Sequence, residues 1–237
     1  SLREQFGGLI GVDSGDARWL QALTQSGLPA VRFGYFPIDV RVPQIVGDAF
    51  LGSLRVVEHL ISHGHKRIAI WRVGIPPRAD GKKALNEREK YAAYRFALAE
   101  AGIEFQKSWE LEMGYVWQDI AKLGQQLMSI KPAPTALFID NDWVTSMIMR
   151  WPGGELPVAK DILSSFEIGH YVDSGRDPSD FLFACAEQPM DRMGELAADI
   201  LLHELAGRHY APDYLLKVPP HFFTAQQVID HAKKQSV

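Results

Sequence analysis

Three apolar runs of this sequence are each followed or closed by a polar side chain that could contact a small ligand. These side chains are Asn141, Glu167 and Gln188, which come at the ends of the runs 135–139, 162–166 and 181–186. The carboxyl ends of parallel strands collect ligands in α/β proteins. Amide and carboxylate groups there suit a ligand rich in hydroxyl or amide groups. Loop surface remains the alternative for each, and the neighbouring Asp142 suits the cap of a following helix.

Three histidines, His59, His63 and His65, form the pattern H-x-x-x-H-x-H at the end of an expected helix. Positions i and i+4 share a helix face, which would suit a metal ion. However, no carboxylate accompanies them in the H-E-x-x-H manner, and histidine is favourable at a helix C-terminus in any case. We therefore expect a solvated helix end and no metal site.

No arrangement of residues argues for catalysis. The sequence lacks a G-x-S-x-G elbow, and the segment from Gly74 to Lys83 has the wrong spacing for a phosphate-binding loop. Cys185 is the only cysteine and lies inside an apolar run, where a thiol is usually inert. A single cysteine also excludes an intramolecular disulfide and a thiolate zinc site. We expect no catalytic residue and no cofactor.

The charge balance disfavours a nucleic-acid-binding module. The 237 residues include 25 basic and 29 acidic side chains, a net charge of −4. The basic residues between Arg78 and Lys90 are explained as a solvated loop and first helical turn. The first residues lack the layout of a signal peptide, and no apolar stretch is long enough to span a membrane. We expect a cytoplasmic protein that does not bind membranes.

Short apolar runs alternate with amphipathic stretches along the chain, which predicts βαβ units and mostly parallel sheets. An early and a late block of such units favour an α/β fold with two lobes. The predicted strands are 7–12, 30–33, 42–46, 68–73, 109–115, 135–139, 162–168, 181–186, 215–218 and 221–224. The predicted helices are 18–26, 49–63, 86–101, 120–130, 142–150 and 190–205.

Residues Gly52–Ile70 have the sequence GSLRVVEHLISHGHKRIAI, which resembles the G-G-x-x-A-x-x-H-L-I-x-x-G-H-R-R-I-A signature of LacI/GalR-type transcriptional regulators. Further segments resemble that family in the same order: RFALAEAGI, PTALFIDND, EQPMDRMGELAADILL and VPPHFFTAQQV. The resemblance implies a two-lobed periplasmic-binding-protein-like fold with an effector in the cleft between the lobes. It also implies a homodimer that couples effector binding to operator DNA.

The resemblance also implies six ligand-binding residues. Lys90 lies where the family usually has an effector-binding Arg, although lysine lacks the planar fork of arginine. Glu167 stands for the Asp of the V-V-G-F-D strand. The six residues are Lys90, Asn141, Glu167, Gln188, Tyr35 and Trp117. Core packing is the alternative for the two aromatic rings.

The same resemblance divides the chain into two lobes. The amino-terminal lobe is expected to comprise residues 1–72 and 189–216, and the carboxy-terminal lobe residues 73–188 and 217–237. The segment GGLIGVD resembles the third strand of the family's amino-terminal lobe. We therefore expect this lobe to be partial and the helix-turn-helix to belong to a part of the protein outside this sequence.

These observations predict the ligand-sensing core of a LacI-type regulator, which binds a sugar-like or nucleobase-like effector and is not an enzyme. A periplasmic solute-binding protein of a transport system is the alternative, and an α/β enzyme is a third candidate. Replacing Lys90 or Asn141 by alanine is predicted to weaken effector binding tenfold or more, with little loss of stability.

Overall fold

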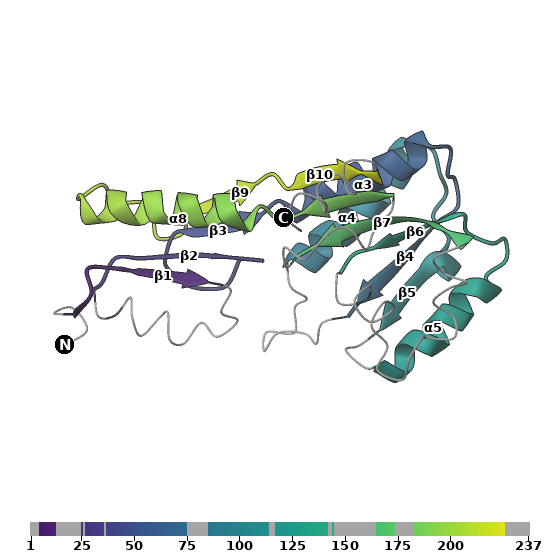
Figure 1. Cartoon of the computed structure of the whole chain (residues 1–237), viewed down its shortest axis with the longest axis horizontal. Coiled ribbons are helices and arrows are strands. Elements are labelled where there is room, and N and C mark those ends of the chain that lie inside the picture. The colour runs from purple at the N-terminus through teal and green to yellow at the C-terminus, as the bar shows by residue number, and fades with distance from the viewer. Residues whose placement is uncertain are drawn as a thin grey trace, which may run out of the picture. The chain divides into compact units, whose positions relative to one another are not determined.

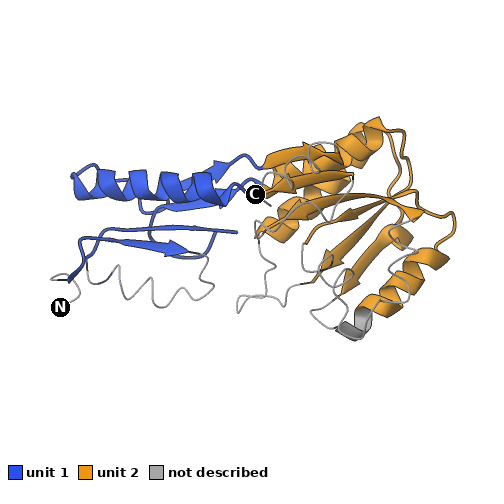
Figure 2. Cartoon of the chain, in the orientation of Figure 1, with its two compact units in different colours: residues 1–48, 188–220 blue, residues 49–187, 221–237 orange. Residues whose placement is uncertain are grey.

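The computed structural model describes residues 5–12, 25, 27–35, 37–74, 85–113, 117–141, 144, 165–173 and 183–225. The chain divides into two compact units (Figure 2). Unit 1 comprises residues 1–48 and 188–220, and unit 2 comprises residues 49–187 and 221–237. Most of the residues of the helices predicted at 18–26 and 142–150 lie outside the described residues.

Unit 1 contains a parallel four-stranded sheet with one long helix packed on it (Figure 1). The strands lie in the order β1 (Leu9–Val12), β2 (Ala30–Gly34), β3 (Gln44–Gly47) and β9 (Leu215–Val218). Helix α8 (Met190–Leu205) packs its buried face on the sheet. The core between them includes Val31, Ile45 and Ala197.

Unit 2 contains a six-stranded sheet covered by helices on both faces. Its strands, in spatial order, are β10 (His221–Thr224), β8 (Ala184–Glu187), β7 (Glu167–Val172), β6 (Ala136–Ile139), β4 (Ile68–Val73) and β5 (Glu110–Met113). All neighbouring strands are parallel except β10, which is antiparallel to β8. The α/β class with mostly parallel sheets is confirmed.

Strand β4 shows why this sheet needs two helical layers. All six of its residues are buried, because successive side chains point to opposite faces. Ile70 packs with helices α3 (Ala49–Ser62) and α4 (Leu85–Glu100), whereas Trp71 packs with α5 (Trp117–Ser129) on the other face. A short 3₁₀ turn, Lys107–Trp109, leads into β5.

The expected boundaries between the lobes differ from the observed units. The sequence analysis placed residues 49–72 in the amino-terminal lobe, but β4 is hydrogen-bonded between β5 and β6 in the sheet of unit 2. Helix α3 also packs on β7 and β8. The chain therefore passes from unit 1 to unit 2 after Asp48, and it does so again after Pro220 because β9 pairs with β3 of unit 1.

The strand predicted at 162–168 is shifted along the chain. The observed strand β7 covers Glu167–Val172, so Glu167 begins the strand instead of closing it. Five of its six residues are buried, including His170. Gly169 lies under α3, where an added Cβ would come within 2.5 Å of Val56 Cγ1. The apolar residues before 167 led to a strand predicted too early in the chain. The observed strand is harder to recognise because it buries a glycine and a histidine in place of aliphatic side chains.

Candidate ligand-binding site

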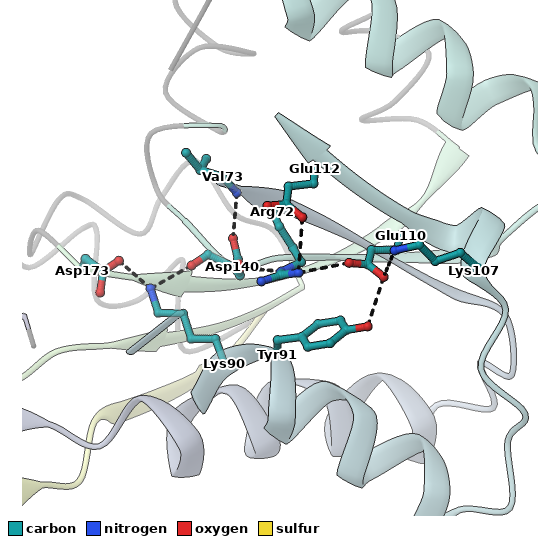
Figure 3. Close-up of polar contacts among 9 residues, drawn as sticks. All are labelled: Arg72, Val73, Lys90, Tyr91, Lys107, Glu110, Glu112, Asp140 and Asp173. Carbon is teal, nitrogen blue, oxygen red and sulfur yellow. Dashed lines mark hydrogen bonds and ion pairs between the residues drawn. The ribbon is translucent and has the colours of Figure 1, made fainter. Parts of the chain in front are cut away.

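Lys90 lies at the centre of a polar site at the carboxyl ends of β6 and β7 (Figure 3). Its side chain is only 2% exposed, because it lies on the face of α4 that packs against the sheet. The Lys90 Nζ donates to the carbonyl oxygen of Asp140 at 2.8 Å and to Asp173 Oδ2 at 2.5 Å. It also lies 4.3 Å from the centre of the Tyr171 ring, a cation–π distance.

Asp140 joins β6 to β4 at this edge of the sheet. Its Oδ1 accepts a hydrogen bond from the backbone N–H of Val73 at 3.3 Å, and its Oδ2 lies 3.6 Å from Arg72 Nε. Burial raises the pKa of Asp140 to about 6, although the charges of Lys90 and Arg72 act in the opposite direction. The main chain of Asp140 thus fixes Lys90 while its carboxylate fixes the end of β4.

Arg72 extends the site towards β5. Its Nη1 donates to Glu110 Oε1 at 3.0 Å and lies 3.7 Å from Glu112 Oε2, and the guanidinium lies 4.2 Å from the centre of the Tyr91 ring. The Tyr91 hydroxyl donates to Glu110 Oε2 at 3.0 Å. Burial alone would raise the pKa of Glu110, but hydrogen bonds from Lys107 and Tyr91 lower it below its ordinary value.

These contacts form one connected set, which we call the Lys90–Arg72 network (Figure 3). Its members are Arg72, Lys90, Tyr91, Glu110, Glu112, Asp140 and Asp173. A hollow of about 530 Å³ adjoins its Arg72–Tyr91 end, and the described part of its lining also includes Phe50, Leu85 and Arg88. Lys90 does not line this hollow.

Asn86 is a further polar side chain near Lys90 that sequence reasoning missed. It lies one helical turn before Lys90 on the buried face of α4 and is 5% exposed. Its Oδ1 is buried and has no hydrogen-bond partner among the described residues. Such an acceptor is available to a ligand donor. The i, i+4 spacing from Lys90 was the signal that could have identified it.

Asn141 lies where the sequence placed it, directly after β6 and next to Asp140 of the network. The side chain of Asn141 is partly buried. The main-chain carbonyl oxygen of Asn141 accepts a hydrogen bond from the N–H of Val144 at 3.2 Å, which starts a helical turn. Asn141 and Lys90 are therefore brought to the same edge of the sheet.

Glu167 lies at the other end of its strand from this site. It is the first residue of β7, and its Oε2 lies 2.6 Å from His65 Nε2, which forms an exposed contact at the amino ends of the strands. The interpretation of Glu167 as a residue at the carboxyl end of a strand is wrong. Asp173, which directly follows β7, has that place and binds Lys90.

Two of the remaining predicted residues belong to unit 1, and the third begins a helix of unit 2. Tyr35 follows β2 in unit 1 and is partly buried, and Gln188 lies in unit 1 and is 2% exposed. Gly47 makes room for Gln188, since a Cβ there would lie 2.6 Å from Gln188 Oε1. Trp117 begins α5, but its side chain lies outside what the structure describes.

The histidines at the end of α3 are held by other contacts. The rings of His59 and His63 have centroids 4.3 Å apart, and both contact Phe183. Burial and the neighbouring His63 lower the pKa of His59. His65 is hydrogen-bonded to Thr135 at 2.9 Å. In the described part of the chain no group of three or more His, Cys, Asp or Glu side chains is arranged to hold a metal ion.

Comparison with known proteins supports the family resemblance. A family model for a periplasmic binding protein-like domain matches residues 57–152. The HTH-type transcriptional repressor PurR of Aliivibrio fischeri is 25% identical over 213 residues, which are 87% of this chain and 59% of that repressor. The ribose operon repressor of Escherichia coli is 26% identical over 183 residues, 75% of this chain and 51% of that repressor.

The chain is similar to LacI-type regulators in sequence and in fold. A LacI-family regulatory protein from Chloroflexus aggregans has the same fold, with a TM-score of 0.70, 19% identity, and coverage of 95% of this chain and 79% of that one. The transcription regulator CcpA of Lactococcus lactis gives a TM-score of 0.68 at 20% identity, with the same coverage of both chains. The expected periplasmic-binding-protein-like fold is thereby confirmed.

The chain spans about half the length of the curated relatives it matches, from 32% to 59%. These relatives carry the names of transcriptional repressors, which favours a LacI-type ligand-binding domain over a transport receptor or an enzyme. Among the residues that the structure describes, no helix is long and apolar enough to cross a membrane.

Proposed function

We propose that this chain is the ligand-sensing part of a cytoplasmic LacI-type repressor and that its effector is a small polar molecule. The observation that carries the proposal is the Lys90–Arg72 network, which lies at the carboxyl edge of the unit 2 sheet beside Asn141. Lys90 and Asn141 are the two positions of unit 2 that the family resemblance assigns to effector binding and that share this edge. In parallel sheets this edge is the usual place for a ligand.

Each residue has a distinct part in the proposed site. Asn141 donates and accepts hydrogen bonds through its amide, which suits a ligand with hydroxyl or ring nitrogen groups. Lys90 is a positioning residue, because its ammonium is bound to Asp140 and Asp173. Asn86 offers a buried acceptor. Tyr35, Gln188 and Trp117 remain predicted contacts from other parts of the chain.

The proposed mechanism is a shift between two states of the protein and involves no chemical conversion. An effector that binds one state more tightly moves the equilibrium towards it by the difference in its two binding free energies. We propose that the protein acts as a homodimer and transmits this shift to operator DNA through a helix-turn-helix outside this sequence. The effector is sugar-like or nucleobase-like in size and polarity.

Asn141→Ala tests the proposal. A thermal-shift screen of sugars, amino sugars, nucleosides and nucleobases first identifies a stabilising compound, and calorimetry then measures its dissociation constant. We expect Asn141→Ala to weaken binding tenfold or more, about 1.4 kcal/mol. Gln125→Ala, an exposed change on α5, is the matched control and should leave affinity unchanged. Equal affinity in Asn141→Ala removes this residue from the site, and conversion of the compound to a product indicates an enzyme.

A further inference from the structure

The hollow beside the Arg72–Tyr91 end of the network is separate from the site proposed above. It lies between the beginnings of α3 and α4, next to the end of β4, and has a volume of about 530 Å³. Small-molecule sites commonly measure about 300–1,000 Å³. Lys90, Asn86 and Asn141 are not among the residues that line it.

Apolar and aromatic side chains form much of the described wall of this hollow. Phe50, Leu85 and Tyr91 are half-buried, and Ala92 is exposed. Arg88 and Glu89 also line the hollow. Covering the apolar side chains with an apolar ligand is favourable, because it removes their surface from water.

Arg72 supplies a hydrogen-bond donor to the hollow. Its side chain is 7% exposed, and its guanidinium lies 4.2 Å from the centre of the Tyr91 ring (Figure 3). The Nη1 group donates to Glu110 at 3.0 Å, whereas the Nη2 group makes no hydrogen bond to a described residue. An N–H group of a buried side chain that lacks an acceptor is costly, so a ligand that offers an acceptor gains from binding here.

The acceptor on the ligand needs no charge, because Glu110 already forms an ion pair with Arg72. The Glu110 side chain is 6% exposed, and its other oxygen accepts a hydrogen bond from the Tyr91 hydroxyl at 3.0 Å. These contacts hold the guanidinium in place and fix the direction of Nη2 before a ligand binds. Such preorganisation lowers the entropy that binding costs.

We propose that the hollow is a second ligand-binding site of unit 2, which takes a flat apolar ring with a neutral acceptor, such as a carbonyl oxygen or a ring nitrogen, at its edge. The ring packs on Phe50, Leu85 and Ala92, and the acceptor binds Arg72 Nη2. The inference goes beyond the proposed function, because it concerns residues to which the family resemblance assigns no role.

Three small probes test the chemistry of this site. Benzamide has the ring and the carbonyl, toluene has the ring without an acceptor, and cyclohexanecarboxamide has the carbonyl without a flat ring. Ligand-detected NMR titrations of the chain measure the three dissociation constants. We expect benzamide to bind at least threefold more tightly than either of the other two. Equal affinities for benzamide and toluene, or no binding of benzamide, overturn the inference.

Two substitutions in the hollow test its location. Ala92→Trp places an indole in the hollow and should weaken benzamide binding at least tenfold. Ala99→Trp, an exposed change on the same helix outside the lining, is the matched control and should leave binding unchanged. Arg72→Lys keeps a positive charge beside Glu110 but lacks the Nη2 donor, so benzamide should bind this variant no better than toluene.

Urea unfolding establishes which variants are folded. If Arg72→Lys is not folded, the three probes and Ala92→Trp decide the outcome. Asn141→Ala should leave benzamide binding unchanged, because Asn141 does not line the hollow. Benzamide binding that survives Ala92→Trp overturns the inference. Benzamide binding that is lost in Asn141→Ala also overturns it, and assigns the probe to the site of the proposed function instead.

Discussion

Replacing Lys90 by methionine should destabilise unit 2 strongly. Methionine keeps an unbranched side chain of similar length, so the change removes the charge with little change in packing. Asp173 would then lose the ion pair with the Lys90 ammonium, and the carbonyl of Asp140 would lose a donor. Breaking a buried ion pair from one side costs about 3–5 kcal/mol. The sequence analysis expects little loss of stability when Lys90 is replaced, whereas the burial of its side chain predicts a large loss.

Urea unfolding at pH 7, followed by tryptophan fluorescence, measures this effect. Five of the six tryptophans, at positions 71, 109, 117, 143 and 151, lie within unit 2, so the signal reports that unit. Lys122→Met, an exposed change on α5, is the control and should cost less than about 0.5 kcal/mol.

A double-mutant cycle with Asp173→Asn separates the ion pair from other effects of Lys90→Met. Each single variant removes one member of the Lys90–Asp173 ion pair, whereas the double variant removes both. The double variant should lose less unfolding free energy than the sum of the two single changes, by about 2 kcal/mol or more. Costs that add to within about 0.5 kcal/mol, or a Lys90→Met cost below about 1 kcal/mol, refute the reasoning.

Three further predictions concern unit 2 and helix α8. Between pH 4 and pH 6 the folded chain keeps a proton on Asp140 that the unfolded chain has lost, so this group should make stability fall by about 3 kcal/mol as pH rises through that window. Asp140→Asn should remove that part of the slope in urea titrations; an unchanged slope would contradict the raised pKa. Gly169→Ala should cost about 1–3 kcal/mol, because its Cβ would lie 2.5 Å from Val56 Cγ1. Gly194→Ala, within α8 and 3.7 Å from the nearest atom, should raise stability by about 0.5–1 kcal/mol, and a lower melting temperature would contradict that expectation.

Much of the fold follows from local sequence patterns. Helix α8 and strands β4, β9 and β10 have the bounds predicted for them, because regular apolar spacing and flanking glycine or proline residues define each one. Gly207, for example, has a φ of +81° directly after the helix end, a conformation that glycine adopts without strain. These signals act over a few residues and are therefore visible in the sequence.

The division of the chain into two units was harder to predict from the sequence. Whether β4 joins the first or the second sheet depends on its pairing with β6, which lies about 68 residues further along the chain. No local pattern reports such a pairing, since an apolar strand is equally suited to either sheet. The boundary consequently moved from residue 72 to residue 48.

The candidate site was predictable where it follows a regular strand. Asn141 was found because β6 is a plain apolar run, and Lys90 was found from a family signature. Asp173 was missed because β7 contains Gly169 and His170, which are small and polar but buried beneath α3. The sequence also predicted that Lys90 binds the ligand. In the structure the Lys90 ammonium instead donates a hydrogen bond to Asp173.

A crystal structure of the chain with a compound identified by the thermal-shift screen tests the central claim most directly. The account predicts ligand density at the carboxyl ends of β6 and β7, with a polar contact between the ligand and Asn141. Ligand density elsewhere on the chain, with none at this edge, would contradict it.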